Sequence, residues 1–468
     1  MFKAIFTNSF GILFSRILGL IRDLMTASFL GANIYTDIFF IAFKLPNLFR
    51  RIFAEGAFTQ VFIPAFTRSR HKAVFSIHIL LVFFLVIMLL TLIVNLFPHA
   101  ASKAIAVGFD AQTITLAAPF VAINFFYLPL IFLVTFLSTF LQYKHHFATT
   151  AYATALLNIA LIGALLLSHG MHESEVVYYL SYGVVIGGLL QLAVHMVAIY
   201  RLNLLPLFAG GIKYYRRKVT AIKKETRQFK QQFFPAIWGN STAQFSAFLD
   251  TWLASFLSVG AISYLYYANR IFQLPLALFA IATSIALFPK VARHLKHSDE
   301  AKAMVFMRKA FWFLLFILSL STLGGYILSY EITWLLFERG AFDATDTLQT
   351  TMVLQMYMIG LLPFGLSKLF ALWLYAQQRQ GEAATIATYT LSSNIVLSLA
   401  LITPMQASGL ALASSLSGFI GFVMTLRAFG SRRFFGIITK KYLLIYVLSM
   451  LLFTLILLVL KEFLHGYL

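Results

Sequence analysis

The chain has 468 residues, of which 60% are hydrophobic and 11% are charged, and this excludes an ordinary soluble protein, in which about half and about a quarter are typical. The formal net charge of +20 does not indicate a nucleic-acid partner, because the basic residues lie in short loops between apolar runs, where they report topology and contact anionic membrane lipids. The absence of cysteine excludes disulfides, thiolate catalysis and cysteine-based metal sites.

Apolar runs long enough to cross a bilayer follow one another along the whole chain. A spanning helix needs about 20 apolar residues, and no stretch is left for a separate soluble domain. We therefore predict an all-α polytopic membrane protein of about thirteen spans. They begin near residues 5, 34, 75, 113, 146, 175, 229, 261, 306, 347, 384, 407 and 441. The first span carries arginines and no small-residue cleavage site, so we interpret it as retained rather than as a signal peptide.

Lysine and arginine are distributed unequally over the connections between these spans. They crowd the connections on one side, above all at residues 201–230, whereas the other side holds only Lys103, Arg339 and Lys461. By the positive-inside rule the crowded side is cytoplasmic, which predicts an N-terminus inside and a C-terminus outside. We interpret the basic segment as a linker held on anionic lipid, with a regulatory role as the alternative.

The two halves of the sequence resemble each other: the fourth and fifth spans match the tenth and eleventh at a constant offset, and the ends of spans two and eight match separately. Both would start inside and hold six spans, which predicts parallel repeats related by an axis along the membrane normal. We predict two pseudo-symmetric six-helix lobes around a central cationic cavity. The predicted divisions are an N-lobe at residues 1–200, a basic linker at 201–228, a C-lobe at 229–430 and an extra C-terminal helix at 431–468. The matched residues are Gln142, Thr149 and Asn158 against Gln378, Thr385 and Asn394, and Phe62, Pro64 and Arg68 against Leu287, Pro289 and Arg293.

Charged residues occur at membrane depth, where each costs at least about 2.5–3.5 kcal/mol and therefore needs a partner or a ligand. The basic ones are Arg16, Arg22, Lys44, Arg50, Arg51, Arg270 and Lys368, and the acids are Asp23, Asp37, Glu55 and Asp250. The excess of positive charge must face water, a ligand or other protein groups. For the two lysines we prefer a paired or snorkelling structural role.

The spacing of these residues predicts which helical faces they occupy. On the first span Gly11, Ser15 and Gly19 recur every four residues as a small-residue stripe, with Arg22 on the same side. Arg16 and Asp23 lie seven residues, about two turns, apart, so we expect them to share a second face of this helix, away from the stripe. The second span has one face with Asp37, Lys44 and Arg51, and another with Asn47 and Arg50 beside Pro46. The eighth span has one face with Ser263, Tyr266, Arg270 and Gln273. Because arginine grips phosphate with two hydrogen bonds, inward-facing arginines on both lobes indicate an anionic ligand.

A second polar group lies on the seventh and eleventh spans. Asp250 shares a helical face with a threonine and a serine, and Asn394 and Ser398 lie one turn apart. Oxygen ligands of this kind suit a hard cation such as Na⁺ or a proton relay. A polar contact between helices is the alternative.

No enzyme motif is present. The sequence has no HExxH, no Walker loop, no Ser-His-Asp pattern and no acidic pair on an aqueous loop. We therefore expect a transporter with no cofactor other than the possible Na⁺. A membrane-embedded transferase would need a catalytic acid or histidine beside the cavity.

The sequence resembles a known family in several segments. Ser15–Asp23 (SRILGLIRD) and Thr36–Phe66, with its run KLPNLFRRIFAEGAF, closely resemble the start of the MurJ (MviN) lipid II flippases. The likeness continues through Leu249–Pro275 and Leu336–Thr347. It implies the fold of the multidrug/oligosaccharidyl-lipid/polysaccharide exporters. It also implies transfer of lipid II across the bacterial inner membrane in peptidoglycan biosynthesis, on which cell shape depends.

The resemblance also implies roles for individual residues. The substrate-binding arginines would be Arg16, Arg22, Arg50 and Arg270, with Ser15, Asp23, Asp37 and Asn47 as neighbours. Lys44, Arg51, Glu55 and Asn158 are interpreted as a gate or as structural polar residues. A family sodium site would fall on Asp250 and Asn394, and Ser398 occupies a position that is acidic in some relatives. Family members usually have fourteen spans, the last two of which form a lipid-holding groove.

The mechanism expected from this resemblance is alternating access. The lobes would rock about the cavity, which takes the diphosphate and sugar headgroup of lipid II (undecaprenyl-diphosphate-linked disaccharide-pentapeptide), while the polyprenyl tail stays in the lipid. We expect a monomer to be functional. An O-antigen or other oligosaccharide-lipid flippase is the closest alternative, whereas a drug/cation antiporter would need an acidic cavity.

Overall fold

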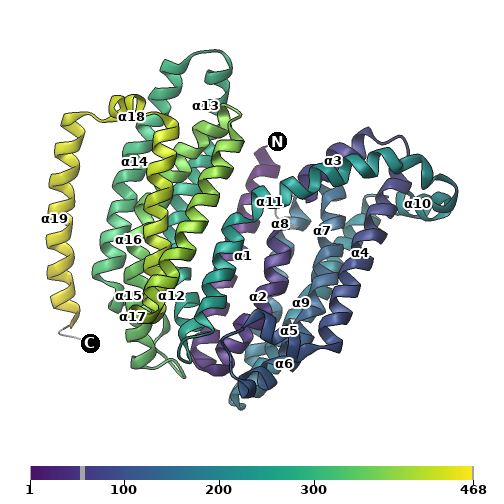
Figure 1. The fold of residues 1–468 in the computed structure, drawn as a ribbon, viewed down its shortest axis with the longest axis horizontal. Coiled ribbons are helices and arrows are strands. Elements are labelled where there is room, and N and C mark those ends of the chain that lie inside the picture. Colours follow the sequence, from purple (N-terminus) through teal and green to yellow (C-terminus); the bar gives the residue numbers. More distant parts are fainter. Residues whose placement is uncertain (1, 53–57, 466–468) are drawn as a thin grey trace. The chain divides into compact units, whose positions relative to one another are not determined.

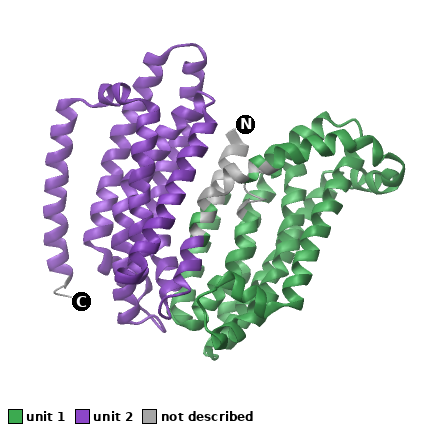
Figure 2. Cartoon of the chain, in the orientation of Figure 1, with its two compact units in different colours: residues 1–248 green, residues 249–468 purple. Residues whose placement is uncertain are grey.

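The computed structural model describes residues 2–52 and 58–465, and every regular element within these ranges is a helix. The predicted all-α fold is confirmed. In a bilayer a helix satisfies its backbone hydrogen bonds within itself, which is why long apolar runs fold in this way. The chain forms two compact units, residues 1–248 and residues 249–468 (Figure 2). The division falls inside one helix, α11 (Lys223–Ala254).

Unit 1 contains ten further α-helices (Figure 1). They are α1 (Phe2–Leu30), α2 (Ile34–Ile52), α3 (Phe58–Arg68), α4 (Lys72–Leu96), α5 (Pro98–Ile105), α6 (Ala111–Phe125), α7 (Tyr127–Tyr143), α8 (Ala148–Leu167), α9 (Glu173–Arg201) and α10 (Leu205–Lys218). A short 3-10 turn, η2 (Thr220–Ile222), joins α10 to α11. Helix α8 packs between α1 and α9, α2 packs on α6, and α10 packs on α4.

A cluster of phenylalanine rings forms part of the core of unit 1. Phe58 and Phe62 of α3 stack with ring centroids 5.2 Å apart, and Phe62 meets Phe136 of α7 edge-on at 5.7 Å. Phe229 of α11 is fully buried, with its ring centroid 6.1 Å from that of Phe58. Aromatic pairs at such distances contribute about 0.5–1.5 kcal/mol each beyond their burial. The cluster therefore fixes the first turns of α11 in unit 1.

Unit 2 contains the end of α11 and the helices that follow it. They are α12 (Ala261–Pro275), the π-helical turn η3 (Leu276–Ile281), α13 (Ala282–Lys296), α14 (Glu300–Ile327), α15 (Ser329–Phe337), α16 (Ala344–Ala376), α17 (Gln380–Phe429), α18 (Ser431–Ile437) and α19 (Lys440–His465). Helix α16 lies at the centre of this unit, because it packs against α12, α13, α14, α15 and α17.

The longest helix of unit 2, α17, is broken once along its 50 residues. Gln406 has φ 53° and ψ −133°, two residues after Pro404. A proline removes a helical hydrogen bond, and a positive φ is costly for a residue with a side chain, so the break marks a sharp change of direction. It coincides with the predicted boundary between the eleventh and twelfth spans.

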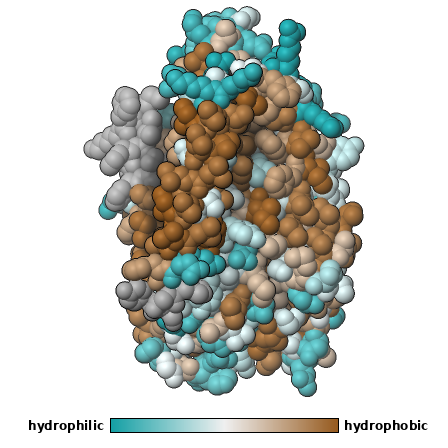
Figure 3. All heavy atoms as spheres, turned by 90° about the vertical axis from the view of Figure 1, so that its left-hand side faces the viewer, coloured by the Kyte–Doolittle hydropathy of each residue, from teal (hydrophilic) through white to brown (hydrophobic). Residues whose placement is uncertain are grey.

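The surface of α19 is suited to lipid. It packs against α14, and Leu444, Leu451, Leu455 and Val459 are each at least 60% exposed. Figure 3 shows the corresponding side of the molecule, where hydrophobic side chains dominate the middle and hydrophilic ones gather at both ends. Nine helical segments of the described residues are long and apolar enough to cross a membrane. The span count and the orientation of the termini stay predictions.

The phenylalanine cluster generates a stability prediction. Phe229→Ala would leave a cavity in the core, and we expect it to destabilise the protein by about 3 kcal/mol. The melting temperature of the purified chain in detergent, followed by intrinsic fluorescence, measures this effect. Phe435, which is 69% exposed, provides the control Phe435→Ala. Equal melting temperatures for the two variants would contradict the role of the cluster.

Candidate functional site

The buried charges of unit 1 centre on Arg22 of α1. Its Nη2 atom lies 2.5 Å from Oδ1 of Asp23, and its Nη1 atom donates to Oδ1 of Asn158 on α8 at 3.1 Å. Arg22 is only 8% exposed and Asp23 only 3%. Removing one partner of such a pair leaves an uncompensated charge, so the three side chains depend on one another. The guanidinium is thus held in a fixed orientation inside the unit.

Asn158 also joins α8 to the backbone of α1. Its Nδ2 atom donates to the carbonyl oxygen of Ser15 at 2.9 Å. The approach of the two helices is close, because a Cβ atom on Gly11 would lie 2.9 Å from Cβ of Ala151, and Gly19 lies beside the Asn158 amide. The small-residue stripe expected on the first span therefore faces α8. Ser15, Arg22, Asp23 and Asn158, which the sequence analysis named separately, form one connected group.

The remaining predicted residues of unit 1 do not all join this group. Arg16 is exposed, and no hydrogen bond or ion pair links its guanidinium to another residue that the structure describes. Its predicted companion on the helix face, Asp23, pairs with Arg22 instead. Helical spacing does not predict this contact, because spacing gives only the directions of the Cβ atoms, whereas a long arginine side chain reaches its sequence neighbour.

On α2 the predicted polar residues differ in burial. Asp37 is 2% exposed, whereas Lys44, Asn47 and Arg50 are half-buried. Nε of Arg50 donates to Oδ1 of Asn47 at 3.0 Å, which joins the predicted i, i+3 pair. The side chain of Arg51 and the whole of Glu55 lie outside the described residues.

In unit 2 the half-buried Arg270 of α12 lies against an aromatic ring. Its Nη2 atom donates to Oη of Tyr266 at 2.6 Å, and its guanidinium carbon lies 4.8 Å from the centroid of that ring. Both contacts hold the arginine against its own helix, one turn away. Farther along the unit, the side chain of Lys368 on α16 is exposed, and its structural role stays a prediction.

Asp250 and Asn394, the predicted cation ligands, meet through a residue that the sequence analysis did not name. The hydroxyl of Ser414 donates to Oδ2 of Asp250 at 3.1 Å. With its amide oriented to suit both neighbours, Asn394 donates to Oδ1 of Asp250 and accepts from the Ser414 N–H, each at 3.3 Å. Ser398 is fully buried, and its Oγ has no hydrogen-bond partner among the described residues. Ser414 lies beyond the break in α17, so helical spacing gave no signal for it.

The donor set of this group suits a hard cation. The side chains of Asp250, Asn394 and Ser414, which are in contact, carry oxygen atoms of the kind that bind such cations. The hydroxyl of Ser398, one turn from Asn394 on α17, is a buried polar group without a partner among the described residues. No cluster of three or more His, Cys, Asp or Glu side chains occurs in the part of the chain that the structure describes. A transition-metal centre is therefore not indicated there.

Comparison with known sequences identifies a family. The sequence model described as "Lipid II flippase MurJ" matches residues 26–468. A probable lipid II flippase MurJ of Helicobacter pylori is 50% identical over 435 residues, which cover 91% of this chain and 94% of the relative. A probable lipid II flippase MurJ of Buchnera aphidicola is 29% identical over 472 residues, which cover 98% of this chain and 89% of the relative.

Comparison with solved structures gives the same fold. A structure described as lipid II flippase MurJ in an inward closed conformation matches with a TM-score of 0.77 at 26% identity, covering 96% of this chain and 97% of that one. An inward-facing multidrug resistance transporter of the MATE family matches with a TM-score of 0.71 at 10% identity, covering 92% and 98%. The second likeness shows the fold alone.

The amide of Asn158 generates a prediction about this group. Asn158→Leu would leave both the Arg22 guanidinium and the Ser15 carbonyl without that partner. Burying an unsatisfied polar group costs about 1–3 kcal/mol, so we expect a lower melting temperature of the purified chain. The control is Thr154→Val on the exposed side of α8. If the two variants melt alike, Asn158 does not hold the group together.

Proposed function

The chain belongs to the lipid II flippase MurJ family, and from this premise we propose that it moves lipid II from the inner to the outer leaflet by alternating access. It is a multi-pass protein of the bacterial inner membrane and a transporter, not an enzyme. Lipid II carries a diphosphate, which must leave water when its headgroup crosses the membrane. Fixed cationic groups at membrane depth lower the cost of that step.

The observation that carries this proposal is the fixed orientation of Arg22. Two other side chains hold its guanidinium inside unit 1, so little rotamer entropy is lost when an anion binds nearby. Exposed Arg16 lies on the same helix, within two turns, and is available to an anionic ligand. Asp23 offsets the charge of Arg22, so the group remains stable when no ligand is bound.

Arg270 would supply a further cationic group for the diphosphate, from unit 2. Its guanidinium is held by Tyr266, and an arginine offers five N–H donors in a planar fork, which suits an anionic group. Arginine is suited to diphosphate, since its planar fork donates two parallel hydrogen bonds to one phosphate group. The sugar and peptide parts of lipid II would rely on neutral polar groups, of which Asn47 is one candidate.

In alternating access the bound site opens to one side of the membrane at a time. After release of the anionic headgroup, the arginines leave the site with excess positive charge. An inside-negative potential acts on each charge moved with about 2.3 kcal/mol per 100 mV, which would drive the empty carrier back. A monomer suffices for this cycle, because each chain contains both units.

Sodium is the proposed coupling ion, at Asp250, Asn394 and Ser398 with Ser414 as an added ligand. A bound cation would replace the hydrogen bonds that Asp250 accepts from Asn394 and Ser414, which lie on the two parts of α17. Binding of the cation would therefore be linked to the arrangement of these two parts. The charge that it brings would also offset that of the carboxylate during transport.

Loss of the Arg270 charge tests the substrate site. Arg270→Ala removes charge-assisted hydrogen bonds of about 1.5–3 kcal/mol, so lipid II transfer should fall at least about ten-fold at normal protein levels. Complementation of growth in a strain depleted of the native protein, with immunoblotting for protein level, measures this effect. Arg432→Ala, at an exposed arginine of α18, is the control. Wild-type growth with Arg270→Ala would refute the assignment of this arginine.

Replacement of Na⁺ by K⁺ tests the proposed coupling ion. Lipid II transfer by the reconstituted protein should rise with Na⁺ concentration, and Ser398→Ala should raise the concentration for half-maximal transfer by about ten-fold, since it removes one oxygen ligand. Ser392→Ala, on an exposed part of the same helix, is the matched control. Transfer that is the same in Na⁺ and K⁺ would exclude sodium coupling.

A further inference from the structure

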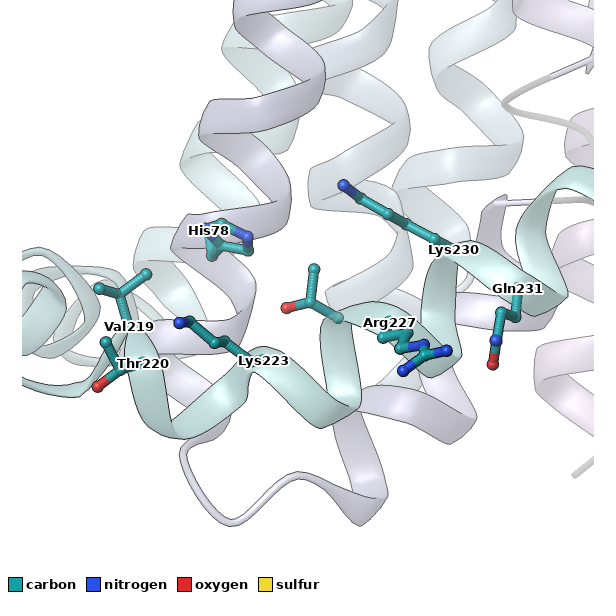
Figure 4. Close-up of a pocket in the computed structure, with 8 residues that line it drawn as sticks. His78, Val219, Thr220, Lys223, Arg227, Lys230 and Gln231 are labelled. Carbon is teal, nitrogen blue, oxygen red and sulfur yellow. The ribbon is translucent and has the colours of Figure 1, made fainter.

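A cavity of about 480 Å³ lies in unit 1, away from the buried arginine group. It is formed where the end of α10, the turn η2 and the first turns of α11 pass over α4 (Figure 4). His78 lines it from α4, and Lys223, Thr226, Arg227 and Lys230 line it from α11. From the sequence alone, most of this stretch is predicted to be a basic linker without a binding site.

The lining of this cavity is strongly cationic. Three of its side chains carry a fixed positive charge, and no carboxylate is among its described lining residues. In Figure 4 the Lys223 and Lys230 side chains extend toward the side of His78, whereas the Arg227 guanidinium turns away toward Gln231. Like charges that converge on one space repel each other, so their arrangement is favoured when an anion lies among them.

Thr226 provides an independent indication of a ligand. It lines the cavity and is only 8% exposed, yet its Oγ1 atom has no hydrogen-bond partner among the described residues. A buried hydroxyl without a partner costs about 1–3 kcal/mol. Hydroxyl groups in helices usually donate to the carbonyl four residues earlier, and this one does not. The hydroxyl is therefore available as a donor to an acceptor in the cavity.

The opposite wall of the cavity is held in place by neighbouring contacts. Nδ1 of His78 lies 2.9 Å from Oη of Tyr215 on α10, and the two rings stack. This leaves Nε2 as the other hydrogen-bonding atom of the imidazole. Helix α10 lies close to α4, because a Cβ atom on Gly211 would come within 2.4 Å of the Ala73 carbonyl oxygen. The histidine is thus fixed by packing before any ligand arrives.

We propose that this cavity binds a phosphate group. A phosphate presents several strong acceptor oxygens at once, and the cavity presents ammonium and hydroxyl donors from α11 beside the imidazole of His78 on α4. This site is separate from the proposed transport site and would tie α10 and the start of α11 to its ligand. The phosphate comes either from the headgroup of an anionic membrane lipid or from a water-soluble phosphate compound. The lipid is favoured by α10, on which Leu205 and Ile212 are 41% and 67% exposed beside basic residues.

Titration of the purified full-length chain tests this proposal. Native mass spectrometry in detergent would follow binding of phosphatidylglycerol, with diacylglycerol as the lipid that lacks the phosphate. Calorimetry with inorganic phosphate forms the soluble arm. Thr226→Val and Lys223→Gln should each weaken phosphatidylglycerol or phosphate binding about five- to ten-fold, as expected for loss of one bond to a charged group. Lys213→Gln, an exposed lysine of α10 that does not line the cavity, should change binding less than about two-fold.

The two arms identify the source of the phosphate. Variant-sensitive binding of phosphatidylglycerol alone supports a lipid ligand, and variant-sensitive binding of inorganic phosphate supports a soluble one. Lys223 is exposed, so its variant is expected to fold even if Thr226→Val does not. The proposal is overturned if neither probe binds more tightly than diacylglycerol. It is also overturned if Lys213→Gln weakens binding as much as Lys223→Gln. Because binding and not transport is measured, either result leaves the proposed function untouched.

Discussion

The structure of unit 1 depends on the cost of keeping the Arg22 charge inside a membrane protein. Lipid cannot solvate a guanidinium, so protein groups must do so. Asp23 supplies a compensating charge and Asn158 a neutral acceptor, and the same asparagine amide binds the α1 backbone at Ser15. The close approach of α8 to α1 at Gly11 is what brings the amide within reach. Charge, hydrogen bonding and helix packing are therefore coupled at one place.

A related arrangement occurs in unit 2, at the asparagine that the repeat analysis matched with Asn158. Asn394 does not solvate an arginine; with Ser414 it surrounds the carboxylate of Asp250. In each unit, then, an asparagine side chain satisfies a charged residue on the helix that opens the predicted repeat, α1 or α11. The charge is a cation in one unit and an anion in the other. This difference agrees with the proposal of an anionic substrate at the first group and a cation at the second.

The all-α fold was predictable because bilayer thickness imposes long apolar runs. Helices occupy the predicted spans, but the eleventh and twelfth spans lie in one broken helix, α17, and the number of spans stays a prediction. The candidate residues were recognisable because a charge at membrane depth is rare. Their contacts were not predictable in the same way. The pairing of Arg22 with Asp23 depends on the reach of a flexible side chain, and Ser414 meets Asp250 only because α17 breaks at Gln406. The cavity at Thr226 was hidden in a segment whose composition resembled any basic linker. The structure describes the two units separately, so the predicted central cavity stays a prediction.

The most direct measurement is the location of the lipid-linked precursor when the chain is depleted from growing cells. An enzyme that cleaves lipid II, added from outside, reports how much of the precursor has reached the outer leaflet. The account predicts that lipid II accumulates and that the added enzyme cannot reach it. Accumulated lipid II that the enzyme cleaves at the normal rate would contradict the account, as would accumulation of a different lipid-linked saccharide in its place.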